Sequence, residues 1–153
     1  MSKSGRDPRL SERERRVKTA LDAVRARCDV DERRAADPVG FVHGYEDPRD
    51  REVVALLAAC IAFGNVKAIR AKMKDLLSRL GDHPARLADG PPAEVRGRLR
   101  GWKHRVFLGE DIARLLVGAG RVQRAHGSLG ALFEAELRRT GALREALARW
   151  CDA

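Results

Sequence analysis

The chain has 153 residues, of which 35% are charged, and its 31 lysines and arginines exceed its 22 aspartates and glutamates to give a formal net charge of +9. This length suits one domain that buries a hydrophobic core without help from disulfides or metal, and the positive excess favours a polyanionic partner. The three cysteines are widely separated and form no Cys-x-x-Cys pair, which argues against a zinc site, a redox pair and an iron–sulfur cluster.

The N-terminal region is dense in charge and lacks the apolar run of a signal peptide. We therefore expect a cytoplasmic protein that is neither secreted nor inserted in a membrane. Residues 1–10 are predicted to form a flexible N-terminus, followed by a single helical domain over residues 11–153. The positive excess is concentrated in three blocks, residues 1–34, 65–79 and 96–124.

Helix start signals organise the first half of the chain. The Ser11–Glu14 capping box predicts an amphipathic helix that runs to Cys28. Asp37-Pro38 and Asp47-Pro48 each place a capping side chain before a proline at the first helical position. We therefore expect a short helix over Val39–His43 and a long helix after Pro48.

The long helix is the centre of the predicted fold. From Val53 to Val66 the sequence carries no formal charge, and up to Phe63 apolar or small residues occupy every direction around a 3.6-residue helix. About eleven apolar residues are too few to cross a bilayer, which needs about twenty. We expect this helix to be enclosed by protein, with Cys60 as a small core residue.

Later helices follow similar signals. Asn65 caps a helix with one apolar stripe, and Gly81 ends it. The remaining helices are predicted from their start residues or apolar spacing: a short turn from Pro84, Pro92–Arg100, about Val106–Arg124, a segment capped by Ser128, and Leu143–Cys151. No segment alternates with period two for long enough to form a strand. The predicted fold is all-α, a multi-helix orthogonal bundle around one buried central helix.

The turn at Gly64-Asn65 and the helix after it form the first candidate binding site. On a helical wheel, Lys67, Arg70 and Lys74 make one narrow cationic strip beside the apolar stripe. Free backbone N–H groups at a helix N-terminus bind phosphate well when cations lie beside them. The alternative is an ordinary solvated helix flank next to a capped turn.

The second candidate site is the segment Trp102-Lys103-His104-Arg105, which follows a run of arginines. An aromatic side chain among cations at a helix start can contact a nucleic-acid backbone, because arginine holds a phosphate through two hydrogen bonds. The alternative is that Trp102 anchors the loop in the core and the cations are only solvated. His104 has no carboxylate nearby in the sequence to orient it, so it is not predicted to be a general base.

No catalytic residue, metal ligand or cofactor is predicted. Glu110-Asp111 is explained most simply as an acidic pair that stabilises a helix start. The histidines at positions 43, 83 and 126 lack the spacing of metal ligands, and the sequence contains no phosphate-binding loop or dinucleotide fingerprint. Whether the chain belongs to an enzyme stays open.

Several segments resemble a bacterial family of domains of unknown function. The segments that carry this resemblance are Asp37-Pro38-Val39-Gly40-Phe41-Val42-His43, Tyr45 to Glu52, Leu56 to Ala59, Phe63 to Val66, Gly101-Trp102-Lys103-His104-Arg105 and Gly127-Ser128-Leu129. The resemblance covers about residues 37–133. It implies that members continue beyond Ala153, so we expect an N-terminal portion or a shortened member, with a partner chain as one source of the missing C-terminal half.

The helix order is also similar to the N-terminal half of the helix-hairpin-helix DNA glycosylases. This resemblance implies that Gly64-Asn65 corresponds to the loop that these enzymes press into DNA near the extruded base. It places Lys103 to Arg105 where the matching helix begins. The hairpin of that superfamily and the catalytic aspartate that follows it are not found in the sequence, so base excision by these residues alone is not expected.

The leading functional hypothesis is a helical domain that contacts double-stranded DNA. Its predicted contact residues belong to the two candidate sites: Gly64, Asn65, Lys67, Arg70, Lys74, Lys103, His104 and Arg105. A competing hypothesis is a protein-interaction or scaffold domain whose last helices pack on another chain through apolar side chains, namely Leu132, Phe133, Leu143, Leu147 and Trp150. A third is a truncated family member with no function of its own.

Overall fold

The computed structural model describes residues 10–153, so the predicted flexible N-terminus over residues 1–10 lies outside the described residues except for its last position. The chain divides into two compact units, one that ends at Arg33 and one that spans Arg34–Ala153. All the buried hydrophobic side chains of the described residues belong to the second unit. The hydrophobic core of the described residues therefore lies within Arg34–Ala153.

Helix α1 (Glu12–Ala26) belongs to the first unit, and α2 (Val30–Ala36) crosses the boundary. The predicted capping box is confirmed: the Glu14 N–H donates to the Ser11 hydroxyl at 3.3 Å, and the Glu14 carboxylate accepts from the Ser11 N–H at 2.7 Å. No residue of α1 is buried. A helix without tertiary packing adds nothing to the hydrophobic core, which lies within the second unit.

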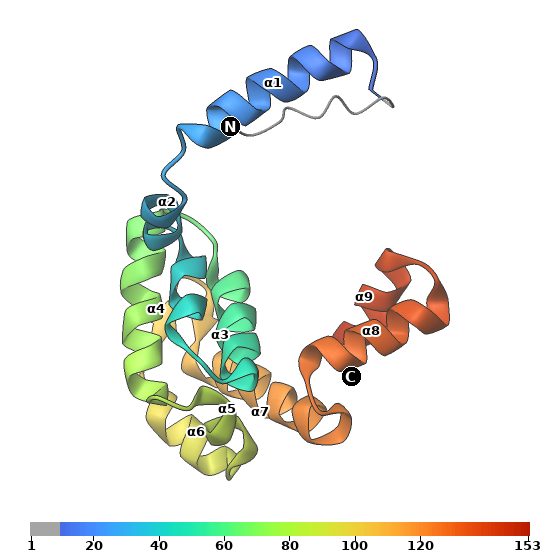
Figure 1. The fold of residues 1–153 in the computed structure, drawn as a ribbon. Coiled ribbons are helices and arrows are strands. Elements are labelled where there is room, and N and C mark those ends of the chain that lie inside the picture. Colours follow the sequence, from blue (N-terminus) through green and yellow to red (C-terminus); the bar gives the residue numbers. More distant parts are fainter. Residues whose placement is uncertain (1–9) are drawn as a thin grey trace. The chain divides into compact units, whose positions relative to one another are not determined.

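The second unit is a bundle of helices with one very short β-hairpin, which confirms the all-α class (Figure 1). A 3₁₀ helix, η1 (Pro38–Gly44), leads into α3 (Pro48–Ile61) and α4 (Val66–Leu80). The elements after α4 are α5 (Pro84–Asp89), α6 (Pro92–Leu99), β1 (Lys103–His104), β2 (Phe107–Leu108), α7 (Gly109–His126), α8 (Leu129–Thr140) and α9 (Leu143–Cys151). Within residues 10–153, none of the helices has the length and apolar character to span a membrane.

Local caps set the starts of η1 and α3, as the sequence predicts. The Asp37 carboxylate accepts from the Val39 N–H at 2.8 Å, and the Asp47 carboxylate accepts from the Arg49 N–H at 2.7 Å. Each aspartate precedes a proline, whose fixed φ suits the first helical position. The predicted boundaries at both Asp-Pro pairs are therefore confirmed.

The core of the unit forms around one side of α3. The side chains that α3 and α4 bury together are apolar and nearly inaccessible to solvent: Val53, Val54, Leu57, Ile61, Ile69, Met73, Leu76 and Leu80. Residues of α5, α6 and α7 complete the same core. The prediction of a central helix is correct for this side of α3.

The opposite side of α3 is not enclosed, contrary to the prediction. Cys60 is exposed, so it is not a core residue. Ala55 and Ala59 line an open apolar hollow of about 430 Å³ whose other wall is made by α8 and α9. Partial burial raises the pKa of the Cys60 thiol, and the neighbouring Cys151 is the second cause. An uncharged helix shows that burial is possible, but the packing of its neighbours decides which sides are covered.

A small β-hairpin replaces the predicted start of α7. Lys103 pairs with Leu108, and His104 pairs with Phe107, so α7 begins at Gly109 and not at Val106. Two features fix this start. The Asp111 carboxylate accepts from the Leu108 N–H at 2.8 Å, and Gly109 packs so closely on α6 that a Cβ atom there would lie 2.0 Å from the Leu99 carbonyl oxygen.

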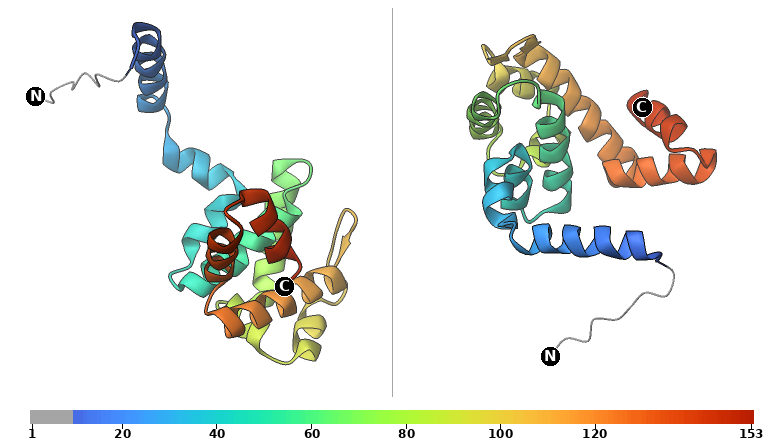
Figure 2. Two further views of the ribbon diagram at one scale, coloured as in Figure 1. Left: turned by 90° about the vertical axis from the view of Figure 1, so that its right-hand side faces the viewer. Right: turned by 90° about the horizontal axis from the view of Figure 1, so that it is seen from above.

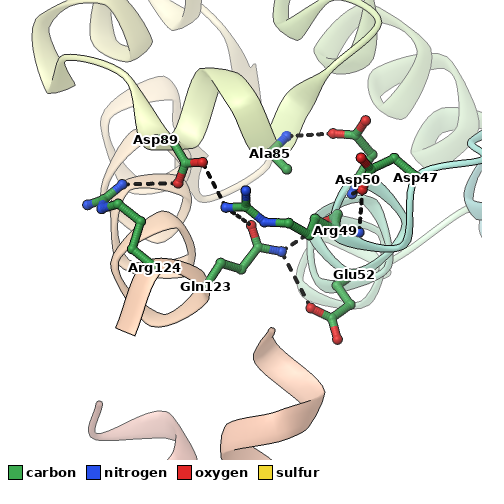
Figure 3. A network of polar contacts seen from close by, with 8 residues as sticks. All are labelled: Asp47, Arg49, Asp50, Glu52, Ala85, Asp89, Gln123 and Arg124. Carbon is green, nitrogen blue, oxygen red and sulfur yellow. Dashed lines mark hydrogen bonds and ion pairs between the residues drawn. The ribbon is translucent and has the colours of Figure 1, made fainter. Parts of the chain in front are cut away.

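The first turn of α3 also supplies a cap to another helix (Figure 3). Asp50 is only 3% exposed, and its carboxylate accepts from the Ala85 N–H at 2.8 Å. The second oxygen of this carboxylate lies 3.2 Å from His83 Nδ1. Because His83 makes no capping hydrogen bond of its own at the start of α5, Asp50 takes that role from across the core.

Glu52, two residues further along α3, caps the N-terminus of α8. Its carboxylate accepts from the N–H groups of Leu129 at 2.7 Å and Gly130 at 2.9 Å. The Ser128 hydroxyl accepts the Ala131 N–H at 2.9 Å, so three first-turn donors of α8 are satisfied. One helical turn of α3 therefore positions the N-termini of both α5 and α8.

Polar contacts to α7 complete this network (Figure 3). Gln123 is 2% exposed, and its amide donates to the Arg49 carbonyl oxygen at 3.0 Å. Asp89 pairs with Arg49 at 2.7 Å and with Arg124 at 3.1 Å. These contacts hold α3 against α5 and α7, although Arg49 Nε has no hydrogen-bond partner in the described structure.

We predict that Asp50→Ala lowers the free energy of unfolding by about 1–3 kcal/mol, because it leaves the buried Ala85 N–H without an acceptor. Urea denaturation followed by circular dichroism measures this loss. As a control, Glu145→Ala on α9 removes an exposed partner of Arg149 and should change stability by less than about 0.5 kcal/mol. Equal effects of the two substitutions would contradict the assigned role of Asp50.

Candidate functional site

The two candidate turns meet in the structure. The Arg105 guanidinium, at the tip of the β-hairpin, lies over the Phe63 ring with its central carbon 5.2 Å from the ring centroid. It also packs on Gly64, where a Cβ atom would lie 2.3 Å from Arg105 Nη2. Figure 2 shows the hairpin as a narrow loop that projects from the body just before α7. Segments about forty residues apart in the sequence thus form one surface, as helical packing commonly allows.

Arg105 is held in an unusual backbone conformation. Among the described residues it is the one non-glycine residue with a positive φ, at 53°. Non-glycine residues in this region are strained and are often found at functional sites. The exposed guanidinium makes no hydrogen bond or ion pair with the described part of the chain. Its N–H donors are therefore free to bind a ligand.

Lys67 and Lys74 are exposed on α4, and neither has an ion-pair partner among residues 10–153. They lie two helical turns apart, about 10 Å along the helix axis. The Asn65 side-chain oxygen accepts from the N–H groups of Lys67 at 3.0 Å and Ala68 at 3.4 Å. The predicted free N–H groups at this helix start are thus already capped, and the side-chain cations carry the positive charge of the site.

Arg70 is not a free member of the cationic strip. Its guanidinium donates to the Asp37 carbonyl oxygen at 2.7 Å and lies over the Phe41 ring, 5.0 Å from the centroid. It therefore ties α4 to the start of η1. The helical wheel placed Arg70 on the correct side of α4, but it could not reveal a partner from another element.

His104 is also removed from the predicted contact surface. It is 4% exposed, and its Nε2 atom has no hydrogen-bond partner in the described structure. Trp102 is 2% exposed, with its ring 6.5 Å from that of His104. The alternative that Trp102 anchors the loop in the core is confirmed. The two buried rings anchor the hairpin in the protein interior, while Lys103 and Arg105 stay exposed.

Phe63 belongs to the first candidate turn and lies at the surface, although it ends the segment that was expected to be enclosed. Its side chain is 61% exposed although it ends the most apolar segment of the chain. The available signal was its position directly before Gly64, where the helix can no longer continue. We define the cationic ridge as seven exposed residues from the two turns, from α4 and from β1: Phe63, Gly64, Asn65, Lys67, Lys74, Lys103 and Arg105.

Both members of the acidic pair Glu110-Asp111 have structural partners. Glu110 pairs with Arg96 and Arg114, each at 3.2 Å, and its position in the first turn of α7 agrees with the predicted stabilising role. Burial raises the pKa of Tyr45, and the carboxylates of Asp50 and Asp82 raise it further. Within the described residues, no group of three or more His, Cys, Asp or Glu side chains could hold a metal ion.

The fold and this surface define an all-α domain with an exposed cationic ridge. The family model described as "Protein of unknown function (DUF2400)" matches residues 37–153, so the chain belongs to this family. The match confirms the resemblance to a family of unknown function and extends it beyond the predicted end at Phe133. Neither the curated proteins nor the solved structures contain a match to the chain.

We predict that Gly64→Ala destabilises the domain by about 1–3 kcal/mol, chiefly because φ at this position is +115°, which alanine adopts only with strain; the exposed Arg105 guanidinium would also have to move aside. Thermal unfolding measures the change. Gly44→Ala serves as a control, since a Cβ atom there meets no other atom within 4 Å. It should have almost no effect.

A double-mutant cycle tests the contact itself. In an Arg105→Ala background, Gly64→Ala should cost less, because only the backbone strain remains and the steric overlap is gone. Additive effects of the two substitutions would show that Arg105 and Gly64 do not contact each other in solution.

Proposed function

We propose that this domain binds double-stranded DNA through the cationic ridge. The observation that carries the proposal is the position of the unpaired Arg105 guanidinium on Phe63 and Gly64, which brings the two cationic turns together. The proposal assigns no catalytic residue to this chain.

The chemistry of the ridge suits a phosphodiester backbone. An exposed guanidinium with free N–H donors binds a phosphate through two hydrogen bonds. Lys67, Lys74 and Lys103 supply further unpaired positive charges, and each phosphate that they neutralise releases counterions. Phe63 adds an exposed aromatic ring at the tip of the same surface, and such rings stack on bases or insert between base steps.

The proposal of a DNA partner also draws on the sequence pattern, whose predicted helix order resembles the N-terminal half of helix-hairpin-helix DNA glycosylases. In that comparison, the turn at Gly64-Asn65 takes the position of the loop that enters the DNA near an extruded base. The exposure of Phe63 at this turn agrees with such a role. Recognition of DNA, without base excision by these residues alone, is the function that we assign.

We predict that affinity for a short DNA duplex falls steeply between about 50 and 200 mM salt, with a log–log slope of about −4 if four ridge cations each contact one phosphate. Fluorescence anisotropy with a labelled duplex measures the slope. Lys103→Ala with Arg105→Ala should make it less steep by about two units. Salt-independent binding, or no binding at low salt, would refute the proposal.

Arg121→Ala with Arg144→Ala is the matched control. Both arginines are exposed, and neither makes an ion pair within the described residues. The control therefore removes the same charge from α7 and α9, away from the ridge. If it reduced the slope as much as the hairpin variant does, binding would depend on net charge and not on the ridge.

A second candidate function is a protein-interaction domain, and the apolar hollow beside α3 favours it. Leu147 is 44% exposed and Leu143 is 61% exposed, while Leu132 is buried and Trp150 donates its Nε1–H to the Leu129 carbonyl oxygen at 2.9 Å. The apolar surface available to another chain is thus smaller than the sequence predicted. Size-exclusion chromatography separates the two functions, since a monomer without affinity for apolar dyes would argue against this one.

A further inference from the structure

A second cationic feature lies beside the ridge, in the cleft between α6 and the start of α7. This cleft encloses about 720 Å³. Its walls combine the last turns of α6, the Gly101-Trp102 turn and the first residues of α7, and the charged side chains among them are Arg96, Arg100, Lys103 and Glu110. Three cations against one carboxylate leave the cleft with a net charge of +2.

The single carboxylate is already neutralised by its neighbours. Glu110 pairs with Arg96 inside the cleft and with Arg114 on its own helix, each at 3.2 Å. The side chains of Arg100 and Lys103 have no hydrogen bond or ion pair with the described chain. Two cations that face one cleft and have no protein partner favour an anionic ligand.

The start of α7 adds partial positive charge to the cleft. The cleft is lined by the N-terminus of α7, a helix of 18 residues whose dipole places partial positive charge there. Trp102 also lines the cleft, and its buried Nε1–H has no hydrogen-bond partner in the described structure. This nitrogen is inaccessible to solvent, so Trp102 forms part of the wall of the cleft and is not one of its donors.

Glycines line part of the cleft. Gly97 and Gly101 both line it, and a Cβ atom at either position would meet no other atom within 4 Å. Gly97 lies inside α6, where glycine is less favourable than alanine. A side chain at this position would enter the cleft without disturbing the packing of the core.

We propose that this cleft binds a phosphate group, with Arg100 and Lys103 as its principal contacts. The inference rests on the proposed function in one respect, because nucleic acid is one source of the phosphate. A phosphorylated small molecule is the second source. Lys103 belongs to both the cleft and the ridge, so a phosphate in the cleft could be part of a strand that also contacts Arg105. A planar guanidinium and an ammonium group recognise phosphate oxygens in complementary ways.

The test uses inorganic phosphate as the probe and the full chain as the protein. Isothermal titration calorimetry at constant ionic strength, with chloride as the competing anion, should detect phosphate binding that Arg100→Ala weakens about tenfold. Gly97→Leu should abolish it by filling the cleft, while circular dichroism shows an intact helical fold. Phosphate that does not bind, or binds equally to Gly97→Leu, would overturn the proposal.

Two further variants sharpen this test. Glu110→Gln removes the one negative charge from the cleft and should tighten phosphate binding severalfold; weaker binding would contradict the proposal. Gly118→Leu is the matched control for Gly97→Leu, because Gly118 also lies inside a helix with open space at its Cβ position but does not line the cleft. It should bind phosphate like the unmodified chain.

DNA binding by the same variants identifies the source of the phosphate and separates the two proposals. If Gly97→Leu weakens binding of a 5′-phosphorylated duplex but not of a 5′-hydroxyl duplex, the cleft holds a strand end; if it weakens both, the cleft holds a phosphodiester. Phosphate binding without DNA binding would refute the proposed function and support the cleft. If the chain binds DNA but not phosphate, and no cleft variant changes DNA binding, the cleft proposal is refuted and the proposed function is supported.

Discussion

The arrangement of the helices depends on two carboxylates near the start of α3. Asp50 caps α5 and Glu52 caps α8, so the helix that forms the centre of the core also fixes where two later helices begin. Both carboxylates accept backbone N–H groups that would otherwise be unsatisfied. Gln123 and Asp89 extend the same network to α7. The cationic ridge depends on this frame, because α7 carries the β-hairpin at its N-terminal end.

In both the ridge and the cleft, a basic side chain lies beside a glycine. Arg105 occupies the space that a side chain at Gly64 would take, and Gly97 lines the cleft with open space at its Cβ position. Meanwhile Trp102 and His104 fill the core beneath the hairpin. The hairpin therefore presents cations outward because its aromatic residues are anchored inward.

The sequence predicted the features that depend on local contacts. The caps at Asp37 and Asp47 bond to N–H groups two residues away, so the pattern of residues was sufficient to identify them. Asp50 and Glu52 were not assigned because their acceptor roles serve residues 35 and 78 positions away. The hairpin was missed because its strands have two residues each, too few to show an alternating pattern.

In the candidate site, too, the sequence predicted the local features and missed the contacts that depend on tertiary packing. Helical spacing identified the exposed lysines of α4, but the contact of Arg70 with Asp37 and the burial of His104 depend on tertiary packing. The double capping by α3 has one more consequence. Successive residues of a helix are rotated by about 100°, so inserting or deleting one residue between Asp50 and Glu52 would turn one carboxylate away from its helix. Substitutions in this turn can be compensated locally, but a change in its length would break the register of the whole bundle.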